Sequence, residues 1–129
     1  MKITINDHRK VYAIQKSFSE MFPYLKLEFF SKPHTAKGAA SKKLTLTPSK
    51  TIGQCRVVHS KGTLTILPHM TVNDLEQGFS ETFGLTVKVL RKSGKAWLET
   101  TATDMWTLEK ENGIGSEMET QAKRMKEMQ

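Results

Sequence analysis

The fold is decided by the stretch TVNDLEQGFSETFG, residues 71–84. Thr71 and Asp74 have the spacing of a capping box, in which side chains accept the free amide protons of a first helical turn. Gly84 suits the left-handed residue that ends a helix. Burial stabilises each large apolar side chain by about 1.5–3 kcal/mol before entropy is subtracted. Spacings of three and four place four such side chains on one helical face: Val72, Leu75, Phe79 and Phe83.

Strands are predicted on both sides of this helix. Apolar residues alternate in Thr63 to Leu67, in Leu85 to Leu90 and in Ala96 to Thr101. The last two are joined by RKSGK, residues 91–95, where Gly94 can adopt a positive φ. Thr103 or Asp104 is expected to cap a short helix that carries Trp106 and Leu108 and stops at Gly113.

The first part of the chain predicts a similar series of elements. A strand over 1–5 is followed by a helix with an apolar stripe and then by a strand over Leu25 to Phe30. Asn6 or Asp7 is expected to cap the helix, and Pro23 to end it. The stripe consists of Val11, Ile14, Phe18 and Phe22.

We therefore predict a two-layer α+β fold, a mixed sheet with helices on one face. A ferredoxin-like βαββαβ arrangement with an added C-terminal strand and helix is expected first, and a β-grasp-like sheet is the alternative. The domain is expected to cover residues 1–113. It contains a basic, mobile loop at 31–50, with a short strand at 44–47. The pattern of residues 51–60 fits either a helix or a strand. Residues 114–129 form a tail with a marginal helix. We find no internal repeat.

The net charge of +7 is unevenly distributed. Residues 1–62 carry 12 Lys/Arg and 3 Asp/Glu, whereas residues 63–129 carry 8 and 10. Such asymmetry is compatible with an anionic partner, and it suits a solubilising loop equally well. A nucleic acid or another polyanion would be bound by a basic segment and by the 91–95 turn, through Lys32, Lys37, Lys42, Lys43, Lys50, Arg56, Lys61, Arg91, Lys92 and Lys95. Stacking surfaces would come from Tyr24, Phe30 and Trp97.

Catalytic motifs are absent from the sequence. It lacks HExxH, GxSxG, GxxxxGK[ST], GxGxxG and CxxC, and KGAASKK, residues 37–43, lacks the spacing of a P-loop. Cys55 and His59 are the one soft-ligand pair, and His34 or His69 would be needed to complete a zinc site. The favoured interpretation is a buried thiol and a surface histidine, with no metal or cofactor. Two carboxylates near the last hairpin, Glu99 and Asp104, are also interpreted as structural.

Two stretches carry a resemblance to a group of proteins: MFPYLKLEFFSK, residues 21–32, and VLRKSGKAWLETTATDMWTLEKEN, residues 89–112. They resemble small hypothetical proteins of the Bacteroidetes, and the resemblance implies no activity. Trp97 and Trp106 bracket a strand-to-helix turn. Core packing is the favoured role for the pair, and an exposed contact patch for another protein is the alternative.

The sequence favours a non-enzymatic binding module, for an anionic partner such as nucleic acid. A protein-interaction domain using a sheet edge, the Trp-bearing turn or the Met-rich tail is the first alternative, and an enzyme of unknown class is the second. No segment predicts a membrane span or a secretory signal, and Cys55, the single cysteine, suits a reducing compartment. The cytoplasm is the expected location.

Overall fold

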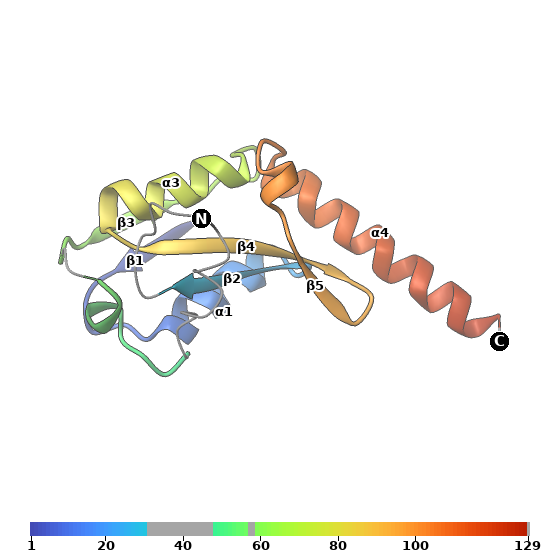
Figure 1. Ribbon diagram of the computed structural model, residues 1–129, viewed down its shortest axis with the longest axis horizontal. Coiled ribbons are helices and arrows are strands. Elements are labelled where there is room, and N and C mark those ends of the chain that lie inside the picture. Colours follow the sequence, from blue (N-terminus) through green and yellow to red (C-terminus); the bar gives the residue numbers. More distant parts are fainter. Residues whose placement is uncertain (31–47, 57–58, 129) are drawn as a thin grey trace.

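Five strands and three α-helices form in residues 1–30, 48–56 and 59–128, which are the residues that the computed structural model describes (Figure 1). The helices lie on one side of two antiparallel sheets, which confirms the two-layer α+β class. The strands are β1 (Lys2–Ile5), β2 (Leu25–Phe30), β3 (Gly62–Thr65), β4 (Thr86–Ser93) and β5 (Ala96–Glu99). The helices are α1 (Val11–Met21), α3 (Val72–Phe83) and α4 (Leu108–Glu127), with 3-10 turns η2 (Ile52–Cys55) and η3 (Thr101–Thr103).

The strand pairing differs from the predicted single mixed sheet. In the described residues, β1 pairs only with β3, and a separate sheet has the order β2–β4–β5. Every described ladder is antiparallel, as the ladders of a ferredoxin-like sheet also are, but that arrangement places the third strand beside both the first and the second. Here β3 lies beside β1, whereas β2 pairs with β4, and no described pair is parallel as one pair of a β-grasp-like sheet is. Alternation along a strand fixes which face it buries but not which strand lies beside it, so the pairing was not determined by the pattern.

The predicted start and end of α3 are confirmed. Thr71 and Asp74 form the reciprocal capping box, and Gly84 ends the helix with a φ of 64°. The apolar stripes of α1 and α3 meet in one core, together with the inward faces of the strands. Its largest fully buried side chains include Phe18, Phe29, Phe79 and Ile14.

Two strand–helix–strand segments repeat each other, so the expectation of no internal repeat is wrong. The units are β1–α1–β2 and β3–α3–β4, and each strand of the first pairs with its counterpart in the second. A shift of 61 positions superimposes Ile3 on Leu64, and these two residues lie opposite each other in the β1–β3 ladder. When two residues that are equivalent in the repeat also lie opposite each other in an antiparallel ladder, an approximate twofold axis passes between them. Identical residues at this shift are Thr4/Thr65, Ile5/Ile66, His8/His69, Val11/Val72, Phe18/Phe79, Ser19/Ser80, Glu20/Glu81 and Phe22/Phe83.

The hydrogen bonds at the start of the two helices repeat as well. The amide of Val11 donates to the carbonyl of Lys50 at 2.9 Å, and the amide of Val72 donates to the carbonyl of Trp106 at 3.0 Å. Each helix therefore receives a returning segment at its N-terminus, which satisfies amides that have no partner within the helix. One returning segment enters η2 and the other enters α4.

The α4 helix continues through Gly113, where the sequence predicted an end. Its first turns are held on the sheet by Glu111, which is fully buried and accepts from Arg91 Nη1 at 2.7 Å and from the hydroxyl of Thr103. Asn112 Oδ1 accepts from the amide of Tyr24 at 2.9 Å. These contacts stabilise a helix that is marginal by propensity alone. Residues 108–127 are therefore one helix rather than a short helix and a separate tail.

Local details also differ from the expectations. The N-cap of α1 is Lys10, while Asn6 Oδ1 accepts from the amides of His8 and Arg9 in the preceding turn. The ambiguous segment 51–60 begins with η2, whose capping box joins Thr51 and Gln54. The predicted loop at 31–50 and strand at 44–47 lie outside the described residues, except for 48–50.

Candidate nucleic-acid interface

The outer face of the β2–β4–β5 sheet carries charged side chains, the half-buried Trp97, and two apolar side chains, Phe30 and Leu90, which are 6% and 9% exposed. Alternation sends every second side chain of each strand to this face. In the register, Lys92 lies opposite Trp97, Lys26 lies opposite Leu90, and Glu28 lies opposite Lys88. The opposite face buries Leu25, Leu27, Val87 and Val89 in the core. The outer face thus presents lysines from two strands beside the indole ring of a third.

Two ammonium groups lie close to the indole of Trp97. Lys26 Nζ lies 4.9 Å from the ring centroid and Lys92 Nζ lies 5.7 Å from it, within the range of a cation–π contact. The Trp97 side chain is half-buried, so part of the ring remains open to solvent. Lys26 also lies 3.7 Å from Glu28 Oε1, in a partly exposed ion pair that holds it weakly. We call Lys26, Lys92 and Trp97 the Trp97 platform.

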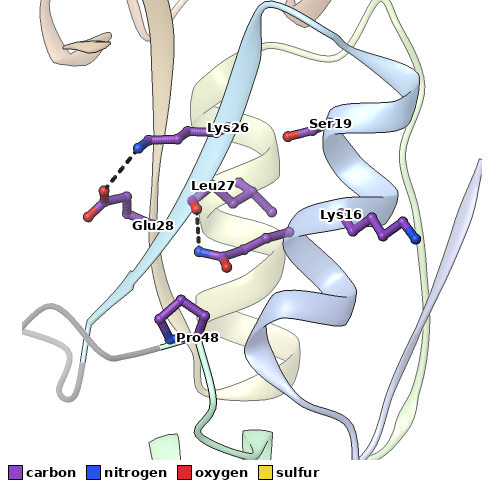
Figure 2. Close-up of a pocket in the computed structure, with 7 residues that line it drawn as sticks. Lys16, Ser19, Lys26, Leu27, Glu28 and Pro48 are labelled. Atoms are coloured by element: carbon purple, nitrogen blue, oxygen red, sulfur yellow. Dashed lines mark hydrogen bonds and ion pairs between the residues drawn. The ribbon is translucent and has the colours of Figure 1, made fainter. Parts of the chain in front are cut away.

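A hollow of about 420 Å³ lies between α1 and β2 and reaches the same lysine, Lys26. Figure 2 shows Lys26 turned toward Glu28 on the strand and Lys16 pointing away from the strand on the helix. Gln15 Nε2 donates to the carbonyl of Leu27 at 2.8 Å across the hollow. The described residues that line the hollow are Gln15, Lys16, Ser19, Lys26, Leu27, Glu28 and Pro48.

Polar side chains of α1 occupy the outer edge of β2. The Gln15 bond to Leu27 is accompanied by one from Ser19 Oγ to the carbonyl of Leu25 at 3.0 Å. Carbonyls with partners of this kind are less available to a further strand. The sheet edge that the sequence offered as an interaction surface is therefore partly covered by the chain itself.

Two of the predicted anion-binding residues have structural partners instead. The Arg56 side chain is fully buried, with Nη2 2.9 Å from Asp7 Oδ1 and Nη1 donating to the carbonyl of Phe83 at 2.9 Å. Arg91 reaches Glu111 on the inward side of β4. A buried guanidinium that already has a carboxylate partner has little capacity left for a phosphate. Arginine spacing in the sequence could not distinguish these roles.

The other predicted basic residues that the structure describes do not gather in one place. Lys92 and Lys95 lie on the β4–β5 hairpin, where Gly94 has a φ of 62° and opens the turn as predicted. Lys50 and Lys61 are exposed near η2 and β3. Figure 1 places η2, in green, at the left of the molecule and the hairpin tip, in orange, well away from it to the right, below α4. The remaining predicted positions, Lys32, Lys37, Lys42 and Lys43, lie outside the described residues.

The aromatic residues that were expected to stack on a ligand or to pack in the core differ in their exposure. Phe30 is only 6% exposed and has no free ring face, whereas Trp97 remains half-buried. The expectation of core packing for the two tryptophans is wrong, because neither belongs to the core cluster. Trp106 lies half-buried on the turn before α4, with Lys110 Nζ 4.1 Å from its ring centroid. Lys26 was missed as a site residue, although its outward position on the strand followed from the alternation.

Cys55 and His59 do not interact with each other in the structure. The Cys55 thiol is buried and donates to the carbonyl of Thr51, and burial raises its pKa. His59 Nδ1 instead lies 2.9 Å from Asp7 Oδ2. Hydrogen bonds from His59 and Arg56 lower the pKa of the Asp7 carboxyl, so this cluster holds a carboxylate in its charged form. A protonated, buried thiol is a poor nucleophile.

The other candidate groups also have separate positions. Glu99 is exposed on β5, and the carbonyl of Asp104 accepts from the amide of Asn73 at the start of α3. Among the described residues, no three His, Cys, Asp or Glu side chains lie close enough to hold a metal ion. No helix in the described part of the chain has the length and apolarity to span a bilayer.

Comparison with protein-family models finds no match for this chain, and comparisons with curated proteins and with solved structures find none either.

Proposed function

We propose that this protein is a non-enzymatic binding module for single-stranded nucleic acid, which it contacts through the Trp97 platform. One observation carries the proposal: the half-buried indole of Trp97 lies beside the ammonium groups of Lys26 and Lys92 on the outer face of the β2–β4–β5 sheet. An aromatic ring stacks on a nucleobase, and ammonium groups beside it neutralise the adjacent phosphates.

The partly exposed indole of Trp97 favours a single strand over a duplex. Bases of a single strand are free to stack, whereas those of a duplex already stack on their neighbours. Lys95 at the hairpin tip extends the positive charge beyond the Trp97 platform. The net charge of +7 adds long-range attraction to any polyanion. Glu99 follows Trp97 by two residues and opposes this attraction, so the affinity should rise when its charge is removed.

The arrangement supports binding more than catalysis. Arg56 and His59 are both bonded to the Asp7 carboxylate, and the Cys55 thiol donates to a backbone carbonyl. Among the described residues that line the hollow beside β2, Glu28 is the single carboxylate, and none is a histidine or a cysteine. Acid–base catalysis needs a pair of groups with distinct protonation states in one cleft.

Fluorescence anisotropy with labelled single-stranded oligonucleotides of mixed sequence tests the proposal. Stacking on one base is worth about 1–3 kcal/mol, so W97A should weaken binding roughly 5- to 150-fold. K92Q should weaken binding and also lower the slope of log affinity against log salt. The matched control is K110Q, which removes the ammonium group from the other tryptophan, and it should leave the affinity unchanged. E99Q should tighten binding.

Two outcomes would contradict the proposal. One is the absence of binding at low salt. The other is binding that W97A and K92Q leave equal to that of K110Q, because the oligonucleotide would then lie elsewhere on the basic surface.

A further inference from the structure

The second half of α4 is a helix with an uncovered apolar face. Gly115 is the last buried residue of α4, and the helix continues to Glu127 (Figure 1). Met118, Met125 and Met128 are 40%, 67% and 86% exposed. Residues 116–128 extend for about 20 Å, a length at which an isolated helix is marginal in water. A surface of this kind gains stability when another helix covers it.

Helical spacing groups the apolar residues on one stripe. Met118, Ala122 and Met125 follow one another at intervals of four and three, which places them on the same face. Methionine side chains are flexible and polarisable, and they pack well against each other at helix interfaces.

Charged residues flank this stripe in a regular order. On one side Glu117 is followed seven residues later by Arg124, and on the other side Glu119 is followed seven residues later by Lys126. Seven residues are two helical turns, so each acid and base of a pair lie on the same side of the stripe. The stripe therefore has an acidic first half and a basic second half.

We propose that two copies of this chain associate through this stripe, with their α4 helices antiparallel. The two helices are related by a twofold axis that passes between Gln121 and Ala122. This axis, the centre of the contact, places Met118 of each copy opposite Met125 of the other copy. The same centre brings the acidic half of each stripe to the basic half of the other, which is the arrangement that opposite charges favour. Parallel helices in register would place acid beside acid and base beside base.

The stripe lies C-terminal to Gly115, the last residue of α4 that is buried. The association does not involve the Trp97 platform, so it stands apart from the proposed function.

Sedimentation equilibrium of the full chain over a roughly hundredfold range of concentration measures the association. The wild-type chain should show a reversible monomer–dimer equilibrium. E117K/E119K should weaken it at least about tenfold, because every interhelical pair then becomes like-charged. The control E81K/E127K changes the net charge equally at exposed positions away from the stripe, and its dissociation constant should stay close to that of the wild type.

A charge exchange within one chain tests the antiparallel direction. E117K/E119K/R124E/K126E restores opposite charges between antiparallel helices and should recover dimerisation to within about threefold of wild type. Far-UV circular dichroism of each variant checks that α4 remains helical. A monomeric wild-type chain, an unaffected E117K/E119K dimer, or a charge exchange that fails to recover the dimer while α4 remains helical would each overturn the proposal.

Discussion

Two glycines of α4 that are two residues apart should respond in opposite ways to alanine. Gly115 faces the sheet, and a Cβ at this position would lie 2.7 Å from Tyr24 Cβ and 3.4 Å from Arg91 Cγ. Carbon atoms in favourable contact are about 3.5–4.0 Å apart. Gly113 faces open space, and a Cβ at this position would meet nothing within 4 Å.

The magnitudes follow from these distances. At Gly113, alanine lowers the entropy lost on folding and should stabilise the protein by about 0.5–1 kcal/mol. At Gly115 the same gain is opposed by overpacking, which costs about 1–3 kcal/mol. Tyr24 Cβ is attached directly to the backbone and cannot rotate away. Relief therefore requires α4 to move off the sheet, which lengthens the bonds of Glu111 and Asn112.

Urea denaturation followed by circular dichroism measures both variants against the wild type. We expect G113A to raise the free energy of unfolding and G115A to lower it, with a gap of about 1–3 kcal/mol between them. Equal stabilisation by the two substitutions would refute the close approach of α4 to β2 and β4.

Two further predictions concern carboxylates with shifted pKa values. Burial raises the pKa of Glu76, whose Oε2 accepts from the amide of Val89, so this group stabilises the fold at acidic pH and costs stability as pH rises through the raised pKa. E76Q keeps an acceptor for that amide. Calorimetry should show a higher Tm for E76Q than for wild type at neutral pH, and the difference should shrink in acid. A lower Tm for E76Q at neutral pH would refute this. The pKa of Asp7 is lowered by His59 and Arg56, so its contribution is present above the ordinary carboxyl range and is lost as pH falls through the lowered pKa. D7N should therefore lower the Tm at neutral pH and approach wild type in strong acid, whereas a pH-independent difference would contradict the ion-pair role.

Local structure was predictable where one segment contains its own determinants. The capping box of Thr71, the left-handed Gly84 and the Gly94 turn were all expected, because each depends on residues close in sequence. The strand partners were not predictable, because period-two alternation is the same for any neighbour. The internal repeat was missed because its identities are scattered over one helix and one strand rather than forming a continuous block.

In the candidate site, too, features local in sequence were predictable and contacts between distant segments were not. Trp97 and Lys92 were identified from a hairpin whose register follows from its turn. Lys26 reaches the indole from β2, a strand distant in sequence, so its part in the Trp97 platform required the tertiary structure. Arg56 and Arg91 were assigned to an anion, because a sequence does not show that Asp7 and Glu111 lie beside them.

The most direct test of the proposed function is the fluorescence of Trp97 itself. In a W106F chain, Trp97 is the single tryptophan, and a base stacked on its indole should quench the emission as single-stranded oligonucleotide is added. We predict saturable quenching whose apparent affinity falls as salt is raised, because phosphate contacts release counterions. Oligonucleotide binding detected by anisotropy without any change in Trp97 emission would contradict the proposed site.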